Sequence, residues 1–340
     1  MLNTRLTCLL QTSALTMGMF LSIHSANAGQ GEVVVMAWGT TWEQGLNAVA
    51  DSFEKESGLK VTRVTQSGSA DGLARLQAMR DAPKVDVWFS TSTLAAQAVK
   101  DQKLFAKIPT SDLKNAGDVI AGAVTSDMVA AYYYPLSIIY RPDLVKQPIA
   151  TWSDLWSAKL TNSIAIPDVQ TYAARMLLTA NTISGGTIND VTPGLEKLKA
   201  LKPNIAMFYG SDSDVRRALA QGEVSVLVGP PSQAKPLRDD GVEVKVVSPK
   251  PSAVMFDVMT LVNTPQQKDG VKFMDYVISH DAQELISRNF DMGPVNKTSA
   301  ASKDLADVLP KESDQAVYDD AKVAANMGAW NEKFQAEIAH

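Results

Sequence analysis

Cysteine and histidine are almost absent from this chain, and their scarcity argues against most nucleophilic and metal chemistry. Among 340 residues there are one cysteine, Cys8, and three histidines. His24 lies near the start and His340 is the last residue, so His280 is the one histidine expected inside the fold. Disulfides, thiolate catalysis, Ser/His/Asp triads and zinc sites of the usual ligands therefore have no basis. Paired-carboxylate chemistry stays open, because Asp and Glu number 37.

Stretches rich in basic residues are also lacking. Lys and Arg number 32 against 37 for Asp and Glu, which gives a formal net charge of −5. Proteins bind nucleic acid and anionic membranes through basic runs or stripes. Because this sequence has none, we expect neither kind of partner.

The first residues have the features of a cleaved signal peptide. Arg5 supplies an early positive charge, an apolar run follows, and Ala26-Asn27-Ala28 forms an A-x-A site, so we predict cleavage after Ala28. Polar residues and Gly18 interrupt the run, which leaves it too short for a membrane span of about 20 residues. We therefore predict a periplasmic protein, soluble after export. Residues 29–340 are enough for two domains.

Strand and helix patterns alternate along the chain and predict an α/β fold. In the first part, strands are expected at 31–37, 59–64 and 85–89, and helices at 41–57 and 70–80. This β-α-β-α-β order is typical of a parallel sheet covered by helices.

A second series of elements follows in the middle of the chain. Strands are expected at 163–166 and 224–228, a helix at 170–180, and a strand at 255–262 that returns to the first series. We predict two lobes, joined by more than one crossover, with a cleft between them. The expected organisation is a signal peptide at 1–28, a first lobe at 29–135, a second lobe at 136–254, a return to the first lobe at 255–300, and a C-terminal helical segment at 301–340 that packs on the lobes.

Residues that directly follow the predicted strands are the candidates for a binding site, since ligands of such sheets bind at the carboxyl ends of the strands. They offer hydroxyl, aromatic and carboxylate groups for a small polar ligand. The candidates are Trp38, Thr41, Ser67, Ser69, Ser90 and Ser92 in the first lobe and Asp168, Thr171 and Ser232 in the second. The alternative for Ser67, Ser69, Ser90, Ser92 and Asp168 is a role as helix N-caps, and the alternative for Trp38 is a place in the core.

Asp257 stands alone as a charged residue in the apolar strand around it, 255–261. A carboxylate is costly to bury without a partner. Asp257 therefore either pairs with a neighbouring cation or faces the cleft, and we place it in the cleft.

Three consecutive tyrosines, Tyr132, Tyr133 and Tyr134, could be ligands of ferric iron, the wall of an organic-ligand pocket, or packing residues of a strand. Side chains alternate along a strand, so Tyr132 and Tyr134 share one face and Tyr133 takes the other. The three cannot converge on one metal ion. Pro135 then suits a crossover between the lobes. Either Tyr133 or the pair Tyr132 and Tyr134 faces the cleft, and which face does so stays open. We expect at least one tyrosine of the run to touch the ligand, with Tyr132 and Tyr133 as the candidates.

Several segments together carry a resemblance to a known family. Residues 53–61, FEKESGLKV, resemble the F-x-K-E-T-G-I-K-V signature of periplasmic solute-binding proteins of ABC importers. Further landmarks occur in the family's order over nearly the whole chain: 85–87, 151–156, 219–224 and 292–296. The resemblance implies a type II-like periplasmic-binding-protein fold, whose two lobes close on a solute, and a membrane permease as partner.

Within the family the chain looks most like the spermidine/putrescine-binding branch. Trp38, Asp168 and Asp257 fall where that branch has an aromatic residue and carboxylates that hold ammonium groups. Met255 replaces the aromatic residue of its W-x-D strand, and Thr171 stands where a second acidic residue is expected. The resemblance therefore implies a small amine, a polyamine or an ω-amino-acid-like solute.

Other hypotheses remain beside the amine receptor. A receptor of the same fold for ferric iron or a phosphonate is the first, although the segment 229–233 lacks the paired tyrosines of the iron-binding branch. An exported carboxylate-based hydrolase is the second, and no motif supports it. We expect a monomer without catalytic residues, metal or cofactor.

Overall fold

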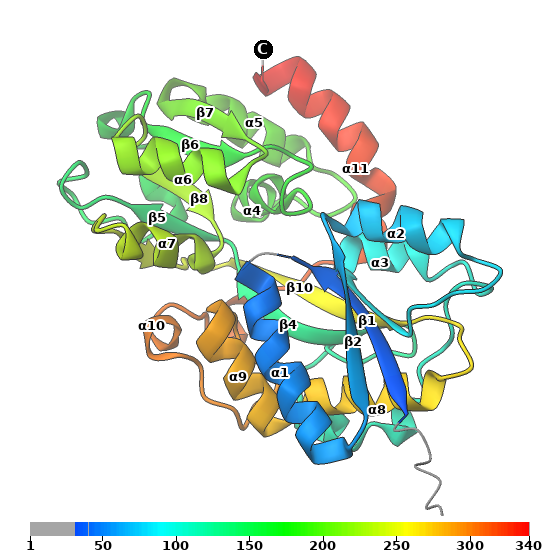
Figure 1. Ribbon diagram of the computed structural model, residues 1–340. Helices are drawn as coiled ribbons and strands as arrows, with labels where there is room; N and C mark the ends of the chain where they lie inside the picture. The colour runs from blue at the N-terminus through cyan, green and yellow to red at the C-terminus, as the bar shows by residue number, and fades with distance from the viewer. Residues whose placement is uncertain (1–30, 40, 340) are drawn as a thin grey trace, which may run out of the picture. The chain divides into compact units, whose positions relative to one another are not determined.

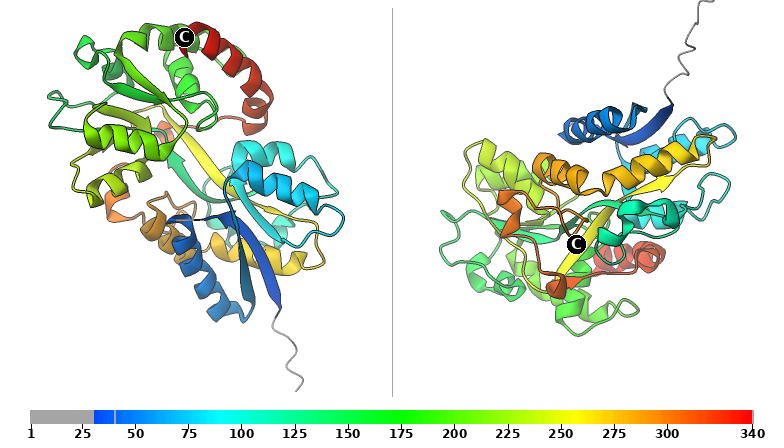
Figure 2. Two further views of the ribbon diagram at one scale, coloured as in Figure 1. Left: turned by 45° about the horizontal axis from the view of Figure 1, so that its top comes forward. Right: turned by 90° about the horizontal axis from the view of Figure 1, so that it is seen from below.

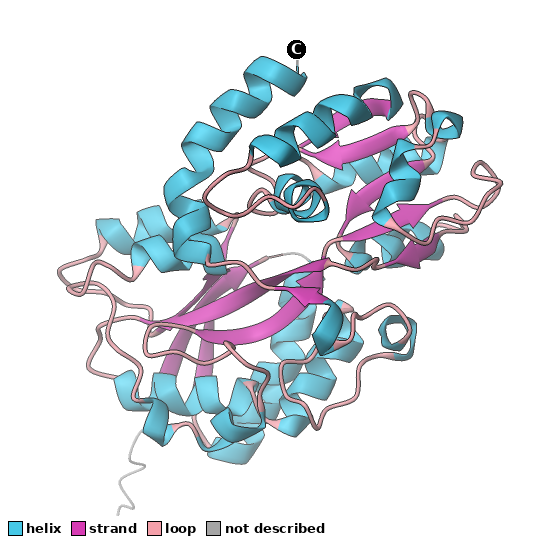
Figure 3. Cartoon of the chain, turned by 180° about the vertical axis from the view of Figure 1, so that it is seen from behind, coloured by secondary structure: helices cyan, strands magenta, loops and turns pink. Residues whose placement is uncertain are grey.

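The computed structural model describes residues 31–39 and 41–339, and for residues 41–44 it describes the backbone alone. The predicted signal peptide, residues 1–28, lies outside this part of the chain. The described chain confirms the predicted α/β fold: two mixed sheets are covered by helices (Figures 1 and 3). No helix within the described ranges combines the length and the apolar character that a membrane crossing needs.

The first sheet is built from both ends of the chain. Its strand order is β11-β10-β3-β1-β2, and β4 pairs with β10. Strands β1, β2 and β3 are parallel, whereas β10 is antiparallel to β3 and to β4. The bounds are β1 Glu32–Trp38, β2 Lys60–Gln66, β3 Val87–Thr91, β4 Val129–Pro135, β10 Ser252–Leu261 and β11 Gln315–Ala316.

Helices cover both faces of the first sheet because its strands are apolar on both sides. Val33 and Val35 of β1 pack toward α1, α8 and α9, whereas Met36 packs toward α2 and α3. Figure 2 shows α1, α8 and α9 gathered on one side of this sheet. The bounds are α1 Thr41–Ser57, α2 Ser69–Ala78, α3 Ser92–Ala98, α8 Gln267–Val277, α9 His280–Phe290 and α10 Lys303–Ala306.

The second sheet uses the middle of the chain, in the order β7-β6-β8-β5-β9. Strand β6 is parallel to β7 and β8, and β5 is antiparallel to β8 and β9. Helices α4 and α5 cover one face, and α6 and α7 cover the other. The bounds are β5 Ser137–Tyr140, β6 Ile164–Pro167, β7 Ile205–Tyr209, β8 Val226–Gly229, β9 Lys245–Val247, α4 Arg175–Ile183, α5 Thr192–Leu201, α6 Asp212–Gln221 and α7 Ala234–Asp239.

The chain crosses between the sheets twice, as predicted. Strand β4 leads into β5 through Leu136, and the chain returns from β9 to β10 through residues 248–251. The two crossing segments are bonded to each other: Leu136 N donates to Ala253 O at 2.8 Å, and the Ser137 and Ser248 hydroxyls lie 2.7 Å apart. The tyrosine run therefore forms the strand that enters the first crossover.

The C-terminal helix α11, Asp320–Phe334, touches helices that belong to both sheets. It packs along α3, and the π-helical end that follows it, Gln335–Ala339, packs on α5. Figure 1 shows α11, in red, running from beside α3 toward α5. The rings of Phe334 and Phe208 meet edge to face with centroids 5.4 Å apart. Short 3-10 helices occupy Thr110–Asp112, Lys114–Asp118, Trp152–Trp156, Ala158–Leu160, Lys202–Asn204, Pro231–Gln233 and Glu312–Asp314.

The helix predicted over 170–180 is wrong in its first turn, because α4 begins only at Arg175. Tyr172, Ala173 and Ala174 have φ angles of 54°, 49° and 59°, in the left-handed region. Such a conformation costs a residue other than glycine about 1–2 kcal/mol. Backbone bonds hold the turn, with Ala174 N on Val169 O at 2.8 Å and Arg175 N on Tyr172 O at 3.1 Å.

Candidate functional site

A pocket of about 1350 Å³ lies where the carboxyl ends of the parallel strands of both sheets meet, and we call it the inter-sheet pocket. From the first sheet it is lined by the ends of β1 and β2 and by the end of α9. From the second it is lined by the residues that follow β7 and β8. Of the predicted site residues, the pocket is lined by Trp38, Ser67 and Ser232.

Asp257 is not among the residues that line this pocket, and it is bound by two tyrosines. The Tyr132 hydroxyl donates to Asp257 Oδ2 at 2.6 Å, and the Tyr134 hydroxyl donates to Oδ1 at 3.3 Å. Only 8% of Asp257 is exposed, and no ion pair reaches it within the described chain. Burial raises the pKa of its carboxyl group to about 7, although the tyrosine donors oppose the shift.

The predicted alternation of the tyrosines is confirmed. Tyr132 and Tyr134 lie on one face of β4, with ring centroids 6.4 Å apart, and both contact Asp257. Tyr133 lies on the other face, beside Phe256 at 6.5 Å. The Tyr132 ring stacks on Phe290 at 6.1 Å, and Phe290 lines the inter-sheet pocket. Tyr132 and Tyr134 thus lie on the face that leads to the pocket.

A second group of tyrosine and carboxylate belongs to the second sheet. The Tyr172 hydroxyl donates to Asp212, the first residue of α6, and accepts from Gln233 Nε2 at 3.0 Å. Arg216 Nη1 donates to Gln233 Oε1 at 2.6 Å. Asp212, Arg216 and Gln233 all line the pocket. Burial first, and then the neighbouring Tyr209 and Asp212, raise the pKa of the Tyr172 hydroxyl well above its usual value.

Asp168 was expected in the binding site, but its side chain binds a backbone amide and does not line the pocket. Its Oδ1 accepts from Thr171 N at 2.7 Å, a local bond that closes the turn after β6. Asp168 is not among the residues that line the inter-sheet pocket, and neither is Thr171. The carboxylates that segments of the second sheet present to the pocket are Asp212, Asp239 and Asp240.

The remaining candidates, Ser69, Ser90, Ser92, Met255 and Thr41, are not among the residues that line the pocket. Ser69 Oγ accepts from Thr91 N at 3.3 Å, and the fully buried Ser90 donates to Thr91 O at 3.2 Å. Ser92 is buried at the first position of α3. Met255 is buried opposite Tyr134 in the β10–β4 pair. Thr41 begins α1, and its side chain lies outside the described part of the chain.

Carboxylates outnumber cations around the pocket. Its lining includes two basic residues, Arg216 and Lys235, and Lys235 pairs with Asp239 at 2.8 Å. The acidic residues of the lining are Asp71, Asp212, Asp239, Asp240 and Asp291. This excess of negative charge favours a cationic ligand.

Sequence reasoning missed Asp212 and Phe290. Asp212 follows strand β7, Ile205–Tyr209, and had this strand been predicted the same rule would have identified Asp212. Tyr172 ends the segment 167–172 that follows a predicted strand and is expected at the cleft, although the helix expected over 170–180 gives it a different backbone conformation from the one observed. Phe290 ends α9 and reaches the pocket only through tertiary packing, so no local pattern indicates it.

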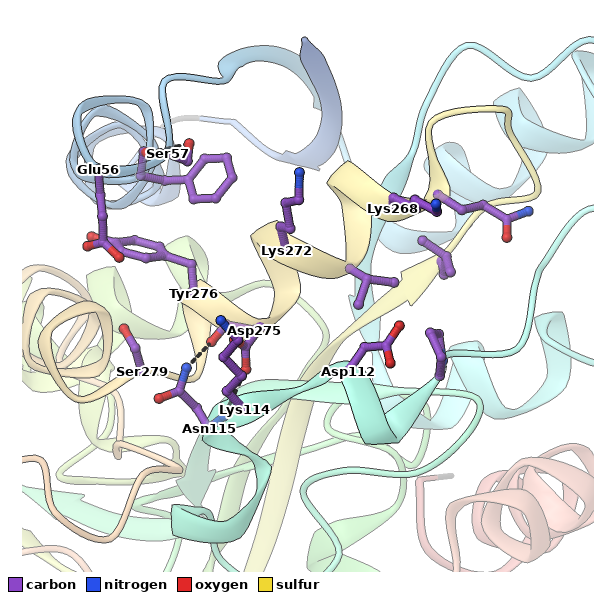
Figure 4. A pocket seen from close by; sticks show the side chains of 15 residues that line it. Glu56, Ser57, Asp112, Lys114, Asn115, Lys268, Lys272, Asp275, Tyr276 and Ser279 are labelled. Carbon is purple, nitrogen blue, oxygen red and sulfur yellow. Dashed lines mark hydrogen bonds between the residues drawn. The ribbon is translucent and has the colours of Figure 1, made fainter.

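A second pocket, of about 610 Å³, lies between α1, α8 and the 3-10 helices after Pro109 (Figure 4). None of the predicted site residues lines it. Its polar groups are partly bonded to one another or to neighbours: Asp275 accepts from Asn115 N at 2.9 Å, and Lys272 pairs with Asp269 at 2.9 Å. We therefore place the candidate site in the inter-sheet pocket.

Proteins with similar sequences include periplasmic solute-binding proteins. The chain is 24% identical over 292 residues to the spermidine/putrescine-binding periplasmic protein of Salmonella typhimurium. This alignment covers 82% of this chain and 81% of the relative. It is 21% identical over 313 residues to the gamma-aminobutyric acid-binding protein of Pseudomonas aeruginosa. This alignment covers 88% of this chain and 85% of the relative.

Solved structures share the fold. An ABC transporter from Clostridium perfringens superposes with a TM-score of 0.77 at 24% identity and covers 90% of this chain and 99% of its own. The Atu4243-GABA receptor superposes with a TM-score of 0.76 at 22% identity and covers 90% of this chain and 97% of its own. Residues 48–311 match the family described as bacterial extracellular solute-binding protein. The chain belongs to the bacterial extracellular solute-binding family.

Proposed function

We propose that this protein is the receptor of an ABC importer and captures a small solute that carries an ammonium group. The observation that carries the proposal is Asp257, a buried carboxylate held by two tyrosine hydroxyls and by no cation of the described chain. An ionised carboxylate in this setting is costly unless a positive charge compensates it. An ammonium group reaching toward Tyr132, Tyr134 and Asp257 would supply that charge.

The rest of the inter-sheet pocket supports a cationic solute. Asp212 and Tyr172 form a similar pair on the side of the second sheet. Trp38 and Phe290 add aromatic rings to the lining, and aromatic faces attract ammonium groups. Relatives whose names specify spermidine/putrescine or gamma-aminobutyric acid agree with a solute of this class.

An ω-amino acid is favoured over a simple polyamine by one further residue. Arg216 lines the pocket among the carboxylates and holds the amide of Gln233. A guanidinium at this place suits a carboxylate at the other end of the solute. The ammonium end would then point toward Asp257.

We propose a two-lobed organisation that fits a role in transport. Two lobes built on the two sheets would close on the solute, since solute-binding receptors work by hinge closure. The predicted limits of 29–135, 136–254 and 255–300 for the lobes and their return remain part of this proposal. The mature protein would act in the periplasm after cleavage at Ala28, deliver its solute to a membrane permease, and catalyse no reaction.

A ligand screen with a matched pair of variants tests the amine. Residues 29–340, unfolded to remove bound solute and refolded, are tested by thermal shift with putrescine, spermidine, gamma-aminobutyric acid, methylphosphonate and ferric citrate. A ligand at about 100 times its Kd stabilises the folded state by about 2.7 kcal/mol. We expect a response to an amine, and roughly a tenfold or larger rise of its Kd in Asp257→Asn, because a charge-assisted contact is lost.

Asp275→Asn is the control, since it makes the same chemical change in the other pocket. Its Kd should equal that of the unchanged protein. A response to methylphosphonate or ferric citrate alone, unaffected by Asp257→Asn, would overturn the amine proposal.

A further inference from the structure

The left-handed turn before α4 links the inter-sheet pocket to the C-terminal helix. At one end of the turn, the Tyr172 hydroxyl contacts Asp212 and Gln233, which line the pocket. At the other end, Arg175 begins α4 and points to α11. The turn thus connects Tyr172, which contacts residues of the pocket lining, with Arg175, which contacts α11.

Arg175 is held from several sides. Only 1% of it is exposed, its Nη1 donates to Ala173 O in the same turn at 2.9 Å, and its guanidinium lies 5.4 Å from the ring centroid of Tyr318. Its Nη2 donates to Asp320 Oδ1 at 2.6 Å. Nε of Arg175 is buried without a hydrogen-bond partner among the described residues.

The same oxygen of Asp320, Oδ1, accepts a second hydrogen bond. The Thr93 hydroxyl donates to Asp320 Oδ1 at 2.9 Å. Thr93 lies in the first turn of α3, directly after β3 of the first sheet, whereas Arg175 belongs to the second sheet's helices. One carboxylate oxygen thus joins elements of both sheets, and a relative movement of the sheets that lengthens one contact disturbs the other.

We propose that Asp320 is a positioning residue of the solute site, which fastens the turn 172–174 to helix α3 and so holds the Tyr172 hydroxyl on Asp212. The assignment of a solute to this pocket rests on the proposed function. The fastening itself rests on the contacts alone. It is needed because a run of three left-handed residues does not persist unless its surroundings hold it.

Hydrogen exchange of the ligand-free protein tests the fastening. Asp320→Ala removes the acceptor of both Arg175 and Thr93. Glu332→Ala is the control, since it removes an exposed carboxylate from the far end of the same helix α11. We expect amides of 172–178 to exchange about tenfold faster in Asp320→Ala than in Glu332→Ala, as expected for the loss of a charged hydrogen bond.

Asp320→Asn is the milder variant if Asp320→Ala fails to fold, because asparagine keeps an acceptor oxygen and loses the charge. Exchange of 172–178 should then rise by a smaller factor. Equal exchange in the Asp320 and Glu332 variants would overturn the proposal, whatever the solute.

A double-mutant cycle tests whether the fastening serves binding. Titrations with putrescine and with gamma-aminobutyric acid give the Kd of Asp320→Asn, Tyr172→Phe and the double variant. Each single change should raise the Kd of the probe that binds, and the two factors should not multiply, because Asp320 acts through Tyr172. Factors that multiply, or an unchanged Kd in Asp320→Asn, would overturn the positioning role. Failure of the unchanged protein to bind either probe would overturn the amine proposal instead, and the exchange comparison would still decide the fastening.

Discussion

At the scale of single residues, Asp257 has the most unusual surroundings. A carboxylate in a fully buried strand would ordinarily be replaced by an apolar residue or paired with a cation. Here two tyrosine hydroxyls take the place of the cation. Hydroxyls stabilise the negative charge only in part, so the carboxyl keeps a pKa of about 7. The residue is therefore poised to ionise when a positive charge arrives.

The raised pKa of Asp257 should make the free energy of unfolding depend on pH. The folded state holds the Asp257 proton up to about pH 7, whereas the unfolded chain releases it near the ordinary value of about 3.9. The contribution of Asp257 to the free energy of unfolding is therefore greatest below about pH 4 and falls as the pH rises to about 7, by about 4 kcal/mol at most. Denaturant unfolding of the unchanged protein and of Asp257→Asn at several pH values measures the difference. A difference that does not change between pH 4 and 7 would contradict the shifted pKa.

At the scale of elements, the turn 172–174 departs most from its local pattern. Apolar residues at helical spacing continue through it, yet the backbone turns left-handed. The conformation is held by tertiary contacts of Arg175 and Tyr172 with residues far along the chain. Local propensity is weak compared with several such contacts together.

Replacement of alanine by glycine should distinguish this turn from a helix. Ala173→Gly removes the strain of a left-handed alanine, so we expect it to leave the free energy of unfolding unchanged or to raise it by up to about 1 kcal/mol. Ala325→Gly, at an exposed position inside α11, should lower it by about 1 kcal/mol. Both values come from urea denaturation. An equal loss in the two variants would show that the turn is not left-handed in solution.

At the scale of the whole described chain, the two sheets bring their strand ends to one pocket with excess negative charge. The aspartates come from segments that no short motif connects: Asp71, Asp212, Asp239, Asp240 and Asp291. Their joint field, more than any single pair, should attract a cationic solute.

Salt should therefore weaken binding in proportion to the charge of the solute. Between 0.1 and 1 M salt the screening length falls from about 10 Å to about 3 Å. We expect the Kd of putrescine, a dication, to rise more steeply over this range than that of gamma-aminobutyric acid, a zwitterion. Titration calorimetry at three salt concentrations measures the two slopes. Equal slopes would mean that the carboxylates of the lining do not act together.

The amino-acid sequence by itself determined the class of fold and much of the local arrangement. The spacing of apolar residues predicts strands and helices, because the side chains on one face of a strand or helix recur with the period of its backbone. The alternation of Tyr132, Tyr133 and Tyr134 followed from strand geometry alone, and so did the exclusion of a three-tyrosine metal site. The isolation of Asp257 in an apolar strand was also visible without a structure.

Only the tertiary structure decided which residues meet. Asp257 meets Tyr132 because β10 and β4 pair in one particular register, and a shift of one residue would have turned either side chain to the other face. Asp212, rather than Asp168, reaches the pocket because Asp168 bonds its own turn. Asp320 joins Thr93 and Arg175 across 227 and 145 residues of chain. Contacts of this kind depend on how distant elements pack, and no pattern within one segment records them.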